Sequence, residues 1–251
     1  MPNTMFLRTP LGVDLAYVHV AGDLPTVVFL GGYRSDMQGT KALYLDQYCR
    51  NSGHAFLRLD YSGHGESGGE FEKGTIGRWV ADARFVIDAM TSGPLVLVGS
   101  SMGGWIMLQL ALSMPEKIQG LVGVAAAPDF TRDLIQRDMS AKERDSLERD
   151  GKVEVCSEYD PQGYTVTRTF IEEGDRHIVL DSPIELNCPV RLLQGMNDEE
   201  VPWQTAIRIA EVITESDVRV VLQKNGDHRL SEPKDLQLLG SLISEVLTLS
   251  G

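Results

Sequence analysis

Residues 95–105 read Leu95-Val96-Leu97-Val98-Gly99-Ser100-Ser101-Met102-Gly103-Gly104-Trp105. The branched apolar run at its start predicts a buried strand, and residues 105–112 have the composition of a helix. Between them lies a Gly-x-Ser-x-Gly pattern, whose glycines permit a sharp turn. The pattern alone also fits an ordinary strand-to-helix turn, but the strand before it and the helix after it favour an exposed, reactive serine. Ser101 is therefore the predicted nucleophile.

The rest of the chain alternates expected strands with expected helices. Apolar runs predict strands at 6–8, 14–20, 26–30, 54–59, 121–126, 189–193 and 218–222. Apolar residues at helical spacing predict helices at 75–90 and 236–246, and others that begin near residues 40 and 202. This alternation predicts an α/β fold with a mostly parallel sheet of about eight strands and helices on both faces.

Residues 129–183 interrupt the alternation. Ser140 opens a charged helix with a capping-box pattern, which runs to Asp150 and stops at Gly151. Residues 165–170 fit a strand or the start of a helix. The segment is either a cap over the carboxyl edge of the sheet or a surface excursion without substrate contact, and such insertions often cover active sites. We therefore expect a core of residues 1–128 and 184–251 and a cap of residues 129–183.

The composition is that of a globular protein with an acidic excess. Hydrophobic residues make up 42% and charged residues 24%, and the net charge is −13. This charge opposes binding to nucleic acid or an anionic membrane, and no apolar run is long enough to cross a bilayer. Cys49, Cys156 and Cys188 are widely spaced and expected to be reduced thiols. Because the opening residues lead straight into an expected strand, we expect a cytoplasmic protein.

A serine nucleophile needs a base, and His228 is the best candidate. A serine hydroxyl is a poor nucleophile at neutral pH unless an imidazole takes its proton. Of the five histidines, His228 is the one that follows the last expected strand in a polar loop. Taken alone, it fits a solvated loop histidine better than a catalytic base. Its place after the nucleophile and a later acid matches one known order of a catalytic triad.

The imidazole in turn needs a carboxylate on its other nitrogen, and Asp198 is favoured for this role. It stands third after Gly195, where the strand at 189–193 is expected to end. Glu199 and Glu200 compete with it, but they lead into an expected helix and suit the positive end of its dipole. Asp129, just past the preceding strand, is a lesser rival.

The oxyanion of a tetrahedral intermediate also needs hydrogen-bond donors. The backbone N–H of Met102 is one predicted donor, and the loop after residue 30 supplies the other, at Tyr33. Gly32, Trp105 and Trp203 are predicted substrate contacts. No cofactor or metal site is expected. The glycines at 63–69 lack the lysine and Ser/Thr of a phosphate-binding loop, and Glu66 would repel a phosphate.

With these residues placed, the chain resembles the α/β-hydrolase superfamily. Within it, the chain looks most like the mitochondrial palmitoyl-protein thioesterases that also cleave acyl glucuronides. The resemblance to the superfamily is carried by residues 31–33, 60–67 and 99–103. The closer resemblance is carried by residues 39–43, 60–63, 98–105, 187–193, 198–203 and 227–229. The resemblance implies Ser101, Asp198 and His228 as the triad, and a structural role for His64. Two departures are the expected lack of a transit peptide, as in a bacterial-type relative, and a poorer match over 129–182.

The expected function is that of a cofactor-free serine hydrolase, which cleaves acyl esters or thioesters through an acyl-enzyme on Ser101. Its expected partner is a small-molecule or acylated-protein substrate. One alternative keeps the triad and changes the reaction, to carbon–carbon bond hydrolysis or acyl transfer. Another is a binding protein without catalysis, since fold does not imply function.

Overall fold

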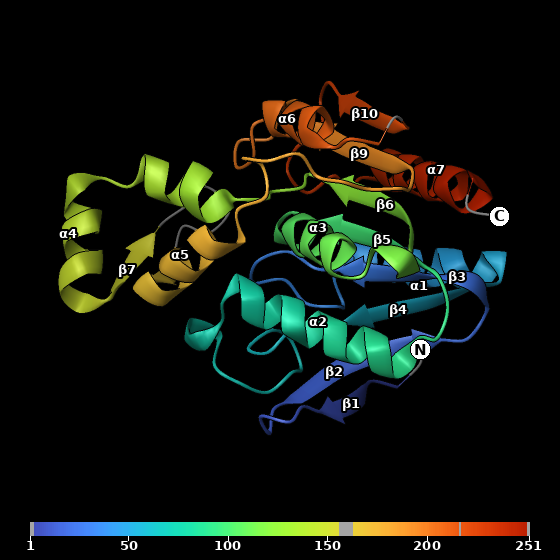
Figure 1. Ribbon diagram of the computed structural model, residues 1–251, viewed down its shortest axis with the longest axis horizontal. Helices are drawn as coiled ribbons and strands as arrows, with labels where there is room; N and C mark the ends of the chain where they lie inside the picture. Colours follow the sequence, from blue (N-terminus) through green and yellow to red (C-terminus); the bar gives the residue numbers. More distant parts are fainter. Residues whose placement is uncertain (1–2, 156–162, 216, 250–251) are drawn as a thin grey trace.

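An eight-stranded sheet forms the centre of the molecule (Figure 1). The computed structural model describes residues 3–155, 163–215 and 217–249. In spatial order the strands are β1 (Met5–Arg8), β2 (Asp14–Val20), β4 (His54–Leu59), β3 (Asp23–Leu30), β5 (Leu95–Ser100), β6 (Ile118–Val124), β9 (Val190–Gly195) and β10 (Val218–Gln223). β2 pairs antiparallel with β1 and β4, and the other pairs are parallel. The mostly parallel sheet expected from the sequence is confirmed.

Helices cover both faces of this sheet. One face carries α2 (Ile76–Met90), α3 (Met102–Ser113) and α6 (Gln204–Val212), and the other carries α1 (Thr40–Ser52) and α7 (Pro233–Leu249). Successive residues of a strand point to opposite faces, so Val28 packs in the first layer and Val27 in the second. Burial on both faces explains why the strands read as continuous apolar runs.

The segment between β6 and β9 forms elements of its own. They are a π-helical turn (Thr131–Gln136), α4 (Ala141–Asp150), β7 (Lys152–Val155), β8 (Tyr164–Thr167) and α5 (Arg168–Gly174). β7 and β8 pair antiparallel and stay outside the main sheet. α4, β7 and α5 lie on the side toward which the parallel strands run (Figure 1). They are therefore placed near the loops that follow those strands.

Several local expectations within the segment are met. The capping box of α4 is present, because the Ser140 hydroxyl accepts from the N–H of Glu143 and the Glu143 carboxylate accepts from the N–H of Ser140. Gly151 ends the helix in the left-handed region, with φ of 74°. The ambiguity at 165–170 is resolved as both alternatives, since β8 passes directly into α5 at Arg168.

Some boundaries differ from the expectation. β6 occupies Ile118–Val124 instead of 121–126, because Ala125 leaves the strand with φ of 46°. α6 begins at Gln204, and the carbonyl of Pro202 accepts from Thr205 in the preceding turn. Cys49 and Cys188 are buried free thiols, and Cys156 lies outside the described residues. Within the described ranges, no helix is both long and apolar enough to cross a membrane.

Candidate active site

Ser101 lies at the junction of β5 and α3 in a backbone conformation rare for a side-chain-bearing residue. Its φ is 55° and its ψ is −123°, a type of strain that costs about 1–3 kcal/mol. Its main chain is fixed by its N–H to Val124 O (3.0 Å) and by Gly104 N–H to its own carbonyl (2.8 Å). A Cβ on Gly103 would stand 2.1 Å from Leu30 O. The turn therefore needs glycine there, and its surroundings hold Ser101 in place.

His228 reaches Ser101 from the loop after β10. Its Nε2 lies 3.1 Å from Ser101 Oγ, and its Nδ1 lies 2.8 Å from Asp198 Oδ2. The two loops that carry His228 and Asp198 are joined by the N–H of Asn197, which donates to Gly226 O (2.9 Å). The structure thus brings together Ser101, His228 and Asp198, the three side chains that the sequence predicts as a catalytic triad.

Asp198 is held by more donors than the sequence predicts. Oδ1 accepts from the N–H groups of Glu200 (3.0 Å) and Val201 (2.8 Å), while Oδ2 accepts from Gln194 Nε2 (2.8 Å) as well as from His228. Gln194 is fully buried at the end of β9. Sequence reasoning missed it. The available signal was a polar residue at the end of a buried apolar strand, four residues before the candidate acid.

The rival acids lie elsewhere or act differently. Asp129 is fully buried, and its carboxylate accepts from the N–H groups of Val179 and Leu180, both at 2.9 Å. Burial raises the pKa of Asp129, while these two hydrogen bonds oppose the rise. Glu200 lies beside the candidate base, with its Oε2 3.3 Å from His228 Nε2, the nitrogen that faces Ser101.

Lys41 connects α1 to the loop that carries His228. Its ammonium donates to the carbonyl of Arg229, the residue after the candidate base. Burial lowers the pKa of Lys41 to about 8, and the charge of Asp227 opposes that fall. The contact supports the loop that carries His228.

The two candidate oxyanion residues, Tyr33 and Met102, lie close to Ser101. Gly32, Tyr33 and Met102 all border the same cavity as Ser101. A Cβ on Gly32 would stand 3.3 Å from Ser101 Cβ, so the loop after β3 passes directly over the serine. The Tyr33 ring turns away into an aromatic cluster, where burial raises the pKa of its phenol.

The cavity beside Ser101 has a volume of about 840 Å³. Its apolar wall consists of Met102, Ala127, Phe130, Leu134, Ile135, Met139, Val155, Tyr164 and Val201. Its charged rim consists of Arg34, Lys41, Asp138, Glu143, Glu199, Glu200 and Arg229. Most of the apolar wall comes from the segment between β6 and β9.

The two tryptophans expected to contact substrate are placed differently. Trp105 is fully buried beneath the site, where its indole N–H donates to His177 O (2.9 Å) and its ring meets Phe130 edge-on. Its role is therefore corrected to packing, because no part of it is open to the cavity. Trp203 borders a second cavity of about 770 Å³ and not the one that contains Ser101.

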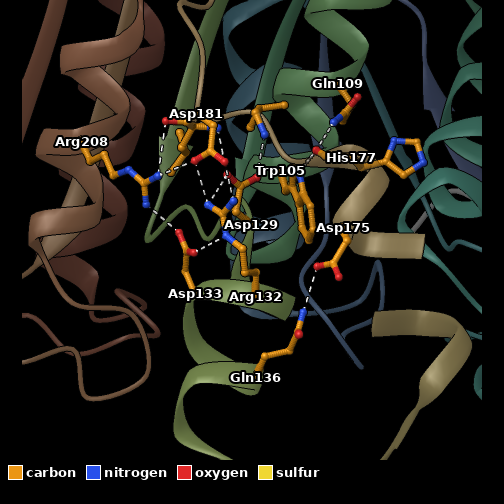
Figure 2. Close-up of polar contacts among 12 residues, drawn as sticks. Trp105, Gln109, Asp129, Arg132, Asp133, Gln136, Asp175, His177, Asp181 and Arg208 are labelled. Atoms are coloured by element: carbon orange, nitrogen blue, oxygen red, sulfur yellow. Dashed lines mark hydrogen bonds and ion pairs between the residues drawn. The ribbon is translucent and has the colours of Figure 1, made fainter. Parts of the chain in front are cut away.

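A polar network joins the segment between β6 and β9 to the core (Figure 2). Arg132 and Arg208 both bind Asp133 and Asp181, at N–O distances of 2.6–3.1 Å. Beside this cluster, Asp129 holds the returning chain at Val179 and Leu180. The start and the end of the segment are thus fastened to each other and to α6.

His64 is buried among aromatic rings, including that of Trp79, at a centroid distance of 5.0 Å. Burial lowers its pKa to about 4, so the ring is neutral near pH 7. It borders neither cavity. Among the residues that the structure describes, no cluster of His, Cys, Asp and Glu could hold a metal ion.

The chain is similar to known proteins in both sequence and structure. A family model described as serine aminopeptidase, S33, matches residues 25–148. The mitochondrial palmitoyl-protein thioesterase ABHD10 of Homo sapiens is 42% identical over 243 residues, which cover 96% of this chain and 79% of that protein. Mouse alpha/beta hydrolase domain-containing protein 10 superposes with a TM-score of 0.91 at 40% identity. The crystal structure of a protein from Agrobacterium vitis S4 superposes with a TM-score of 0.93 at 40% identity. Each of these two superpositions covers 98% of this chain and 98% of the other chain.

Proposed function

This chain belongs to the α/β-hydrolase superfamily, in the family of ABHD10, and is a hydrolase of the esterase and thioesterase class; on that premise we propose that it works through an acyl-enzyme on Ser101. Its substrates are acyl esters or thioesters. The observation that carries the proposal is the continuous contact from Ser101 Oγ to His228 Nε2 (3.1 Å) and from His228 Nδ1 to Asp198 (2.8 Å). This is the geometry that general-base activation of a serine requires.

In the first half of the reaction, Ser101 Oγ attacks the acyl carbonyl while His228 Nε2 takes its proton. Asp198 fixes the ring and stabilises the imidazolium that forms. The N–H groups of Met102 and Tyr33 face the developing oxyanion. As the tetrahedral intermediate collapses, His228 returns the proton to the alcohol or thiol that leaves, and the acyl group stays on Ser101.

In the second half, water takes the place of the leaving group. His228 Nε2 removes a proton from the water, whose oxygen attacks the carbonyl of the Ser101 ester. Collapse of this second intermediate breaks the bond to Ser101 Oγ, which regains a proton from His228. The products are a free acid and the original enzyme, so no cofactor is consumed.

The apolar wall and the charged rim of the cavity suit different parts of the substrate. Residues 129–183 act in this proposal as a cap whose apolar side chains, including Leu134 and Ile135, cover the acyl group. The leaving group, from a small molecule or an acylated protein, lies at the charged rim near Lys41 and Glu199. A cytoplasmic location stays a prediction, and the curated mammalian relatives are named as mitochondrial.

The proposal is tested with a fluorophosphonate probe and a series of substrates. Wild type and Ser101→Ala are incubated with the probe, then assayed on p-nitrophenyl esters and acyl-CoA thioesters of graded chain length. We expect labelling of wild type only, and a loss of turnover of roughly 10⁴-fold or more in Ser101→Ala. Ser100→Ala is the matched control, because Ser100 is the preceding residue and borders the same cavity. Ordinary activity in Ser101→Ala together with an unlabelled wild type would refute the mechanism.

A further inference from the structure

The ring of Tyr33 occupies the centre of an aromatic cluster. Its centroid lies 4.9 Å from Phe71, 5.9 Å from Trp79, 5.8 Å from Phe130, 5.5 Å from Tyr164 and 5.3 Å from Phe170. The Phe170 ring is nearly parallel to it, at 21°, and the others meet it at steep angles. Edge-to-face and offset-stacked arrangements at these distances stabilise ring pairs beyond simple burial. The ring is therefore held from several directions at once.

The rings around Tyr33 come from both parts of the chain. Phe71 and Trp79 belong to the core, whereas Phe130, Tyr164 and Phe170 belong to residues 129–183, here called the cap. α5, which carries Phe170, lies beside α2, which carries Trp79 (Figure 1). The side chain of Tyr33, in the loop after β3, is thus in contact with rings of both the cap and the core.

A second contact joins the same loop to the cap hairpin. The guanidinium of Arg34 lies 5.9 Å from the ring centroid of Tyr164 and donates to Gly163 O (3.4 Å). The phenol of Tyr33 also lies 3.5 Å from Thr165 O, at the long limit of a hydrogen bond. Tyr33 and Arg34, neighbours in one loop, therefore both contact the cap hairpin, Tyr33 at β8 and Arg34 at β8 and the residue before it.

The main chain of this loop passes over Ser101. Gly32 packs against the serine, and the carbonyl of Gly31 accepts from the phenol of Tyr61 (3.3 Å) in the core. The loop is consequently fixed by the core at Gly31 and by core and cap rings together at Tyr33. Because the ring is packed on several sides, the Tyr33 Cα and its N–H cannot shift unless the ring also moves against these contacts, so the packing restrains the position of the N–H.

We propose that the Tyr33 side chain is a positioning residue, through which the cap holds the N–H of Tyr33 at the oxyanion. This inference rests on the proposed function and extends it, since it makes the cap part of the catalytic geometry as well as a cover. The aromatic contacts keep the loop in its productive place. When this contact is loosened at Phe170, which does not border the cavity, substrate binding stays normal but the transition state is stabilised less well.

Phe170 offers the clearest test, because its ring stacks on Tyr33 while it is 2% exposed and does not border the cavity. Phe170→Leu should lower kcat roughly 10- to 100-fold with little change in KM, as expected when a catalytic group is misplaced by about 1 Å. Tyr33→Leu should lower kcat similarly, whereas Tyr33→Phe, which keeps the ring, should remain near wild type. The double variant Tyr33→Leu/Phe170→Leu should be no slower than the worse single variant, because both changes break one contact.

The matched control is Ile171→Val, a truncation of the next buried residue of α5. It should keep the wild-type kcat. Rates are expressed per site that a fluorophosphonate labels at completion, so that unfolded protein does not count; if Phe170→Leu fails to fold, Phe170→Met replaces it. A raised KM at unchanged kcat, multiplied losses in the double variant or an equal loss in Ile171→Val would overturn the inference. A wild type that the probe does not label would instead contradict the proposed mechanism.

Discussion

The carboxylate of Asp198 takes four hydrogen bonds, and the one from Gln194 reaches the same oxygen as that from His228. Gln194→Leu removes this donor and also leaves Val201 O without the amide that now binds it at 3.1 Å. A hydrogen bond to a charged group is worth about 1.5–3 kcal/mol, so we expect kcat to fall by about tenfold or more. Steady-state kinetics of the variant measure the fall in kcat, and thermal unfolding measures the stability lost with the hydrogen bond to Val201 O.

A second glutamine separates catalysis from stability. Gln223 stands at the end of the neighbouring strand β10, and its amide binds Asp235 Oδ1 (3.1 Å), away from Ser101. Gln223→Leu should lower the melting temperature but leave kcat intact. Equal kinetic losses in both variants would show that Gln194 acts through general stability alone.

His64 should make the fold sensitive to acid. Burial lowers its pKa in the folded protein to about 4, whereas the unfolded value is 6.5. Between these values the unfolded chain binds more protons, so the free energy of unfolding decreases as the pH falls from 6.5 to 4, by about 3 kcal/mol. Well above pH 6.5 the ring is neutral in both states and has no such effect.

The measurement is denaturant unfolding of wild type and His64→Phe at pH 7, 5.5 and 4. The variant cannot titrate at this position and fits the aromatic surroundings, although it loses the contact of Nδ1 with Ser62 O (3.3 Å). Its stability should decline less steeply with acid than that of wild type. Parallel declines would mean that other groups account for the acid sensitivity.

At the scale of elements, the attachment of the cap depends more on Asp129 than on the arginine cluster (Figure 2). Asp129 is fully buried and holds two main-chain N–H groups, so Asp129→Asn should cost about 1.5–3 kcal/mol. Arg208 is 40% exposed and its ion pairs are worth about 0–1 kcal/mol each, so Arg208→Gln should cost less. Thermal unfolding, together with limited proteolysis within 129–183, ranks the two variants. A larger loss in Arg208→Gln would reverse the order of importance.

The sequence predicts those elements whose signals are local. The capping box at Ser140, the stop at Gly151 and the Gly-x-Ser-x-Gly turn each depend on residues within a few positions, and each lies where it was expected. The approach of Asp198 and His228 to Ser101 was also foreseeable, because the carboxyl ends of parallel strands meet at one edge of the sheet. Chain order and strand topology were enough to choose those residues.

Contacts between distant segments were not foreseeable from local pattern. Trp105 follows the nucleophile turn and was expected at the substrate, but α3 directs it into the core against His177. Gln194 and the rings around Tyr33 acquire their partners only when loops and cap pack together. The identity of an apolar or amide residue in the sequence does not indicate which distant residue its side chain will contact.

At the scale of the whole molecule, two electrostatic influences act on an arriving substrate. The net charge of −13 repels anions over a distance of about one Debye length. The rim itself carries both signs, with Arg34, Lys41 and Arg229 against a larger number of carboxylates, among them Glu199 and Glu200. Local and global charge therefore point in the same direction, toward a site that disfavours anionic leaving groups.

This balance predicts how the rate depends on salt. With one acyl chain and three leaving groups, kcat/KM should rise with added NaCl for the anionic acyl-CoA thioester and fall for the cationic acylcholine ester. The neutral p-nitrophenyl ester serves as control and should change little. Because steering falls off with ionic strength, we expect changes of about 2- to 10-fold between low salt and about 0.3 M. If the thioester rate fell with salt instead, the basic groups at the rim would outweigh the acidic surface, and anionic acyl carriers would be the better substrates.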